Sequence, residues 1–281
     1  MATETRAGAT RPGLPPSARA TRVAPAGSGY LPSSVPHDLL AGVYAAHRRL
    51  LGLAATLDDE TLARPSLLPG WTVGHVLTHL ADDARGQADL VDTVAESSVT
   101  TRAPAAEPAP GRLISRSAAA GAGPSEAIRD DLATAIARLE RSWDQTHVDV
   151  WRTGYGLTPG TGTDRRNEPV TLADLVFLRW REVEIHGIDL GLTDRGGPGW
   201  AGLPAPYVDA EWAWTTARLA ERLPPGGSVL LAPGDRPSRA FGMGSHPAIV
   251  GAPTVETLRW LLGRLPGPAT PREWPALRPW E

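Results

Sequence analysis

The chain has 281 residues, with 28 basic and 31 acidic side chains, a net charge of −3 and no cysteine. A chain of this length can bury a hydrophobic core without help from a metal. The lack of cysteine excludes disulfides, thiolate metal sites and a thiol nucleophile of the chain's own, so any metal must be bound by His, Asp or Glu. The arginines form no basic stripe, so we expect no nucleic-acid partner. No apolar run approaches the roughly 20 residues that cross a bilayer, and the N-terminus lacks the basic-then-apolar order of a secretory signal. We therefore expect no membrane partner and a cytoplasmic location.

Composition and spacing define the N-terminal part of the chain. Residues 1–36 contain almost no large apolar side chains, and we expect them to form a disordered extension. From His37 on, apolar residues recur three and four positions apart, which indicates an amphipathic helix over about 37–57. Thr72 is suited to cap the start of a second helix, which continues toward Val94.

Two further helices follow, each after a long loop rich in Gly, Pro and small residues. Thr171 followed by Asp174 is a capping-box pattern and marks the start of the last of these helices. The two loops are expected at 97–124 and 151–170, and the two helices at about 124–147 and 171–190.

The predicted fold class is α+β. Four amphipathic helices with two long connections predict a four-helix bundle over residues 37–195, followed by a small α/β C-terminal domain over 200–265 and a Pro-rich tail over 266–281. In the C-terminal domain we expect a helix near 207–222, strands at 228–232 and 238–243, and a helix at 254–264.

The fourth helix carries three polar side chains on its apolar face, which is defined by Leu172, Leu175, Val176, Val183 and Leu190. Counting about 100° per residue, Arg179, Glu182 and His186 lie on this face. By the same count Arg181 and Glu184 point away, and we expect them to be solvated or to lie between domains. Charges on a core-facing stripe need partners, because burying an unpaired charge is unfavourable.

Spacing alone leaves two interpretations of these residues open. In the first, Glu182 forms an ion pair with Arg179, and His186 is hydrogen-bonded nearby. In the second, Glu182 and His186 bind a metal together, because residues four apart are adjacent on a helix surface and bundle cores commonly build metal sites from such pairs.

A third ligand would come from another helix, and the second helix offers His75 and His79, which are four residues apart, so a rival site that uses both is an alternative. The apolar residues of that helix centre roughly 120° from His79 and roughly 160° from His75, so His79 is nearer the core. We therefore predict a site of His79, Glu182 and His186, with His75 exposed or at the mouth of the site. Two histidines and one carboxylate leave coordination positions open, which is typical of catalytic zinc.

Nearby carboxylates are candidates for orienting the ligating imidazoles. Asp189 follows His186 by three residues, and Asp82 and Asp83 follow His79 by three and four. A carboxylate so placed can hold an imidazole in position. The alternative for each is an ordinary charge on a helix surface, and we select Asp189 and Asp83 as the candidates.

Three segments of the sequence resemble the mycothiol-dependent maleylpyruvate isomerase family of the DinB-like superfamily. They are Leu-Pro-Gly-Trp-Thr-Val-Gly-His-Val-Leu-Thr-His-Leu at 68–80, Arg-Glu-Val-Glu-Ile-His-Gly-Ile-Asp-Leu at 181–190, and Val-Gly-Ala-Pro at 250–253 through Trp-Leu-Leu-Gly-Arg at 260–264. The resemblance spans about 37–265. By this resemblance the family's metal ligands fall on His79, Glu182 and His186.

The resemblance implies a DinB-like helix bundle that holds one zinc ion, joined to a smaller α/β domain that helps close the site. It also implies mycothiol as a thiol cosubstrate, whose reactive thiolate a zinc with open positions would favour. In the isomerase reaction the thiolate would add to the cis double bond of maleylpyruvate, the new single bond would rotate, and elimination would give fumarylpyruvate. Arg179 could hold a substrate carboxylate or the cosubstrate.

Fold and metal do not establish the substrate, so alternatives stay open. The same site could transfer the thiol to another electrophile, a zinc-activated water could hydrolyse a substrate, or the chain could be a non-enzymatic metal-binding or ligand-sensing module. The expected partners are a small electrophile and a low-molecular-weight thiol, with no obligate protein partner.

Overall fold

The computed structural model describes residues 35–100, 124–151, 154–155, 170–265, 270–271 and 273–279. The predicted N-terminal extension, the two predicted loops and the Pro-rich tail fall wholly or partly outside these residues.

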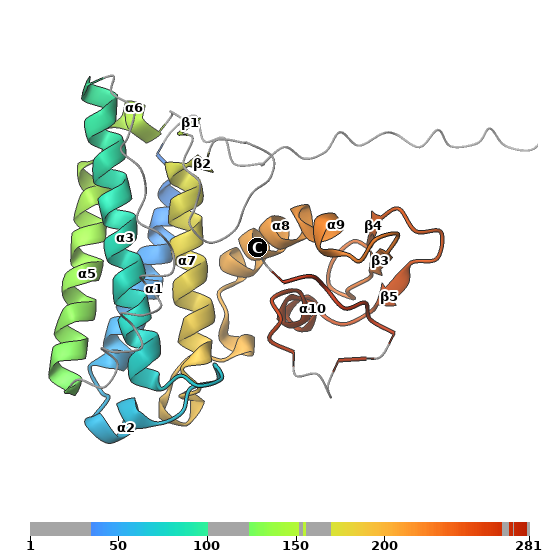
Figure 1. The fold of residues 1–281 in the computed structure, drawn as a ribbon, viewed down its shortest axis with the longest axis horizontal. Helices are drawn as coiled ribbons and strands as arrows, with labels where there is room; N and C mark the ends of the chain where they lie inside the picture. The colour runs from blue at the N-terminus through green and yellow to red at the C-terminus, as the bar shows by residue number, and fades with distance from the viewer. Residues whose placement is uncertain are drawn as a thin grey trace, which may run out of the picture.

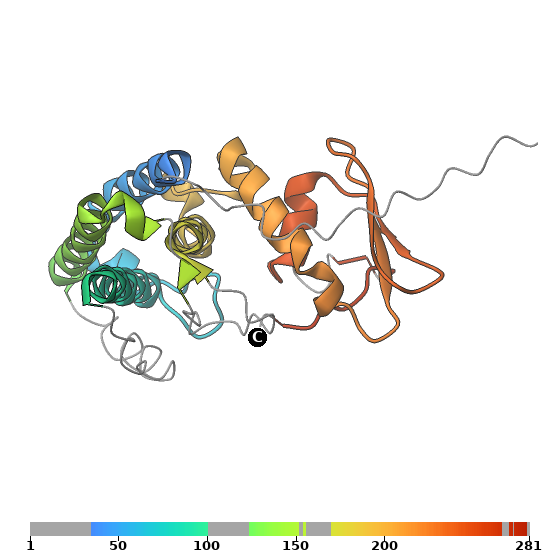
Figure 2. The same cartoon turned by 90° about the horizontal axis from the view of Figure 1, so that it is seen from above.

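Four long helices lie side by side and form the predicted bundle (Figure 1), and they are seen end-on in Figure 2. Within the bundle, α3 packs most extensively on α5, and α1 on α7. The second predicted helix was expected to end near Val94, but it continues to Thr100, into the segment that was expected to be a loop. The four helices are α1 (His37–Ala54), α3 (Val73–Thr100), α5 (Ser125–Gln145) and α7 (Leu172–Asp189).

Local hydrogen bonds fix the starts of the two helices that carry the candidate ligands. At α7 the predicted capping box is present: the Thr171 side chain accepts from the Asp174 N–H, and the Asp174 carboxylate accepts from the Thr171 N–H. At α3, Thr72 Oγ1 accepts from the His75 N–H, and His75 Nδ1 accepts from the Thr72 N–H at 3.0 Å. The caps set where each helix begins.

Several short elements were not predicted, because they hold too few residues to show a periodic pattern. In the helical part they include α2, whose N-terminus is capped by Asp58. Their bounds are α2 (Asp59–Ala63), α6 (Val148–Trp151), the strands β1 (Gly154–Tyr155) and β2 (Val170–Thr171), which pair antiparallel, and the 3-10 turns Thr193–Arg195 and Trp200–Gly202.

The C-terminal part lies beside the bundle next to α7 (Figures 1 and 2) and has its own cluster of buried side chains. Strand β3 is central: it pairs antiparallel with β4 and parallel with β5. The helix expected near 207–222 is divided at Arg218, and β5 was not predicted. The elements are α8 (Ala205–Ala217), α9 (Leu219–Arg222), β3 (Ser228–Leu231), β4 (Arg239–Gly242), β5 (Ala248–Val250) and α10 (Thr254–Leu261). The predicted α+β class, a bundle followed by a small α/β part, is confirmed.

Two charged residues of α7 that were expected to point away from the core have different surroundings. Arg181 reaches α8, where its Nε donates to the fully buried Glu211 at 3.1 Å, which agrees with a place at the junction. Glu184 is buried, and its carboxylate accepts from Arg49 of α1 and from the Trp180 ring N–H. The expectation of a solvated or inter-domain Glu184 is wrong, because α1 packs against this side of α7.

Among the helices that the structure describes, none combines the length and the apolar character needed to cross a bilayer.

Close packing between α1 and α7 depends on Gly42. A Cβ atom built on Gly42 would lie 2.5 Å from the nearest ring carbon of Trp180, a buried side chain that cannot easily move. We predict that Gly42→Ala lowers the free energy of unfolding by about 1–3 kcal/mol through overpacking, measured by chemical denaturation.

Gly52 supplies the matched control, because it lies in the same helix and nothing lies within 4 Å of a Cβ built there. Gly52→Ala should therefore stabilise the chain by about 0.5–1 kcal/mol through helix propensity. Equal effects of the two substitutions would contradict this account of the α1–α7 contact.

Candidate metal centre

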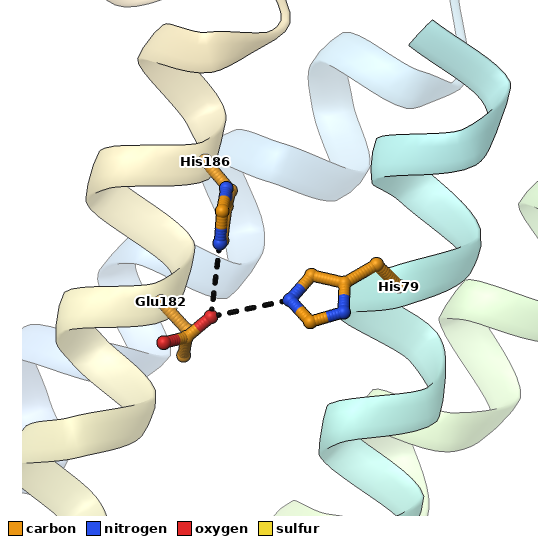
Figure 3. A group of neighbouring side chains, drawn as sticks. All are labelled: His79, Glu182 and His186. Carbon is orange, nitrogen blue, oxygen red and sulfur yellow. Dashed lines mark hydrogen bonds and ion pairs between the residues drawn. The ribbon is translucent and has the colours of Figure 1, made fainter. Parts of the chain in front are cut away.

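His79 of α3 and Glu182 and His186 of α7 point toward one another (Figure 3). Glu182 Oε2 lies 3.1 Å from His186 Nε2 and 3.4 Å from His79 Nε2. One ligand-type atom from each residue lies within 4.8 Å of the others. The side chains are 15–31% exposed, so the group lies at the edge of the core and is partly open to solvent. The structure thus brings together the three residues selected from the sequence.

A second layer of contacts holds His186. Its Nδ1 lies 3.0 Å from Asp189 Oδ2, and Asp189 in turn accepts from Arg264 Nε at 2.9 Å and Nη2 at 2.8 Å. Asp189 is only 1% exposed. Because the carboxylate occupies Nδ1, His186 presents Nε2 to Glu182. Asp189 lies where the sequence predicted an orienting carboxylate, and Arg264, which was not selected, supports it from the C-terminal part.

The charges in this group compensate one another. Burial acts to raise the pKa of Glu182, but hydrogen bonds with His186 and His79 outweigh it and hold that pKa well below its usual range. Burial acts to lower the pKa of His186, but its hydrogen bonds with Asp189 and Glu182 raise it to about 9. These interactions favour a negative charge on Glu182 and a positive charge on His186.

His79 is bordered by aromatic rings. The ring centroids of Trp71 and His79 are 5.6 Å apart in an edge-on contact, and those of His79 and His186 are 4.9 Å apart. His75 lies one turn earlier in α3, also in edge-on contact with Trp71, and is part of the helix cap. The choice of His79 over His75 agrees with this geometry.

Asp83 and Arg179 are paired with each other. Asp83 Oδ2 accepts from Arg179 Nη1 at 2.7 Å and from Gln87 Nε2 at 3.2 Å. Within the described residues, its side-chain hydrogen bonds thus go to these two partners and not to His79. Arg179 is completely buried, and the ion pair that the structure gives it is with Asp83, not with Glu182. Contact of Arg179 with a substrate stays a prediction.

The donor set suits a divalent cation. Two imidazole nitrogens and one carboxylate oxygen lie within 4.8 Å of one another, and these atoms are of the types that zinc accepts. The buried Asp189 holds the His186 imidazole through its other ring nitrogen. Three protein ligands leave further positions for an exogenous molecule.

Comparison with known proteins places the chain in a family. The model of the mycothiol maleylpyruvate isomerase N-terminal domain matches residues 43–191. The chain belongs to this family. The prediction of an enzyme of the mycothiol-dependent maleylpyruvate isomerase family is therefore confirmed.

Solved structures show the same fold beyond the matched domain. A crystal structure of a mycothiol-dependent maleylpyruvate isomerase aligns with a TM-score of 0.68 and 19% identity, covering 85% of this chain and 96% of the other. A structure of a histidine-to-alanine mutant of such an isomerase aligns with a TM-score of 0.67 over the same shares, also at 19% identity. None of the curated proteins compared matches the sequence.

His47 should make the stability of the bundle depend on pH. Burial lowers the pKa of His47 to about 4 from an ordinary value of 6.5, although the hydrogen bond with Glu140 acts to raise it. The unfolded chain therefore takes up a proton here before the folded chain does. We predict that the free energy of unfolding decreases as the pH falls from 6.5 toward 4. His47 should account for up to about 3 kcal/mol of this decrease.

The measurement is the free energy of unfolding across this pH window for the wild type and for His47→Gln, which has no titrating group at this position. The variant should lose less stability on acidification. Equal pH dependence in both proteins would show that His47 does not cause it.

Proposed function

We propose that the chain binds one zinc ion through His79, Glu182 and His186 and uses it in a mycothiol-dependent reaction of the maleylpyruvate isomerase type. The observation that supports this most strongly is the convergence of the three ligand-type side chains from α3 and α7. The family membership of residues 43–191 supports the choice of thiol and reaction type.

The protein's own residues supply a prepared site. The bidentate contact of Arg264 with Asp189 and the contact of Asp189 with His186 fix the ring so that Nε2 faces the site. The anionic Glu182 provides the negative charge that balances a cation. When bound, zinc with an open position would favour the thiolate form of a thiol ligand, which is the nucleophile that the chain cannot provide because it has no cysteine.

The surroundings fit a small polar electrophile near an aromatic wall. The Trp71 ring borders His79, and the three ligand side chains are partly exposed, so a reactant can approach. In an isomerisation, the thiolate sulfur would form a bond to one carbon of the cis double bond and the electron pair would move toward the conjugated carbonyl. Rotation and reversal of the same step would return the thiol unchanged, so no oxidant or reductant is needed.

The metal site is tested by removing ligands one at a time. His79→Ala and Glu182→Ala should each lose most bound zinc while the bundle still folds, because these side chains lie at the edge of the core and are partly exposed. Zinc content after dialysis, with circular dichroism to check folding, is the measurement.

The control is His75→Ala, a histidine one turn away in the same helix that is not among the proposed ligands. This variant should keep its zinc. Full zinc occupancy in His79→Ala and Glu182→Ala would reject the site.

The reaction is tested on purified, zinc-loaded protein by following maleylpyruvate conversion with and without mycothiol. We expect fumarylpyruvate to form only when mycothiol is present. Conversion of a different electrophile only with mycothiol would indicate thiol transfer. Thiol-independent hydrolysis, or no turnover with any thiol or ester, would contradict the proposed reaction.

A further inference from the structure

Arg179 carries a positive charge in the centre of the bundle, where its side chain is 0% exposed. Its Nε donates to His47 Nε2 of α1 at 3.0 Å. Its Nη1 donates to two acceptors of α3, the Leu80 carbonyl oxygen at 2.9 Å and Asp83 Oδ2 at 2.7 Å. A single side chain of α7 is therefore bonded to two neighbouring helices.

His47 extends this chain of contacts to the fourth helix. The Arg179 guanidinium has only donors, so His47 Nε2 must be the acceptor and the imidazole proton must be on Nδ1. That proton points to Glu140 Oε1 of α5, 2.8 Å away. Protonation of both ring nitrogens would set an N–H against the N–H of Arg179. The contacts fix one tautomer of a neutral His47.

The contacts with α3 lie close to the metal centre along both helices. Leu80 and Asp83 follow His79 by one and four residues, and Arg179 precedes Glu182 by three. At about 1.5 Å of rise per residue, the link between the helices lies about one turn from Glu182. It joins the helix that carries His79 to the helix that carries the other two ligands.

We propose that Arg179 is a positioning residue for the metal centre, because its bonds to Leu80 and Asp83 hold α3 and α7 at the spacing that lets His79 share one cation with Glu182 and His186. This role rests on the metal centre proposed above. It differs from substrate binding, since the Arg179 side chain is 0% exposed and its Nε and Nη1 donors are already engaged inside the bundle, while Nη2 is buried without a partner among the described residues.

A purely structural role predicts something different. Buried ion pairs often add little stability compared with apolar side chains of similar size, whereas removing one partner leaves an uncompensated charge. Replacing both charges, in Arg179→Met/Asp83→Leu, should therefore leave a folded bundle that lacks the polar link. If the link only stabilised the fold, metal affinity measured well below the melting temperature would not change.

The experiment measures Zn²⁺ affinity of the full chain by competition with a chromophoric chelator, and the visible absorption of the Co²⁺ form as a signature of ligand geometry. We expect Arg179→Met/Asp83→Leu to bind Zn²⁺ roughly 10–100-fold more weakly, with an altered Co²⁺ spectrum. Arg179→Lys keeps a charge but cannot bridge His47 and Leu80 together, so it should also bind Zn²⁺ more weakly. This variant provides the test if the double variant does not fold.

His47 provides a matched pair of variants outside the ligand set, because its side-chain hydrogen bonds go to Arg179 of α7 and Glu140 of α5. His47→Leu removes the acceptor for Arg179 Nε and should weaken Zn²⁺ binding, whereas His47→Gln keeps an acceptor and should retain more of the affinity. Leu139→Ala is the control for general destabilisation, because Leu139 is a fully buried residue of α5. It should lower the melting temperature and leave the affinity and the Co²⁺ spectrum unchanged.

Folded Arg179 variants with wild-type affinity and an unchanged Co²⁺ spectrum would overturn the positioning role while leaving the metal centre in place. An equal loss of affinity in Leu139→Ala would overturn it as well. If the wild-type chain binds neither metal, the proposed metal centre itself fails, and the positioning role fails with it.

Discussion

The guanidinium of Arg179 is the constraint around which the bundle is organised. A positive charge with no exposure to solvent needs a nearby negative charge and hydrogen-bond acceptors, because the free energy of burying an unpaired charge is large. Nε and Nη1 of Arg179 have acceptors, whereas Nη2 is buried without one among the described residues. The acceptors lie on two other helices, α1 and α3. His47, the acceptor on α1, in turn donates from Nδ1 to Glu140 on α5. These hydrogen bonds therefore fix the positions of the four helices relative to one another more strictly than hydrophobic contacts alone would.

Helix α7 shows why the site lies where it does. Its side toward α3 carries Glu182, its side toward α1 carries the buried Glu184, and Arg181 reaches α8. Each of these three polar side chains is hydrogen-bonded or ion-paired with the helix on its side of α7. Packed elements therefore surround α7, and it has no purely solvated face. A ligand group on such a helix is held more rigidly than one on a loop, which favours a preformed metal site.

The C-terminal part contributes to the centre through its contacts with α7. Arg264 holds Asp189, and Asp189 holds His186, so the orientation of one candidate ligand depends on a residue from outside the bundle. Glu211 makes a second contact with α7 through Arg181. The geometry of the centre is thus coupled to how the C-terminal part packs on the bundle.

The sequence by itself determined the four long helices, the caps of α3 and α7 and the phase of their side chains, because these depend on residues within a few positions of one another. Helix phase was enough to place Glu182 and His186 together and to prefer His79 over His75. Only the tertiary structure decided that Asp83 pairs with Arg179, that Glu184 is buried by α1, and that Arg264 supports Asp189. These contacts join residues far apart in the chain, and periodicity gives the direction of a side chain without the identity of its neighbour.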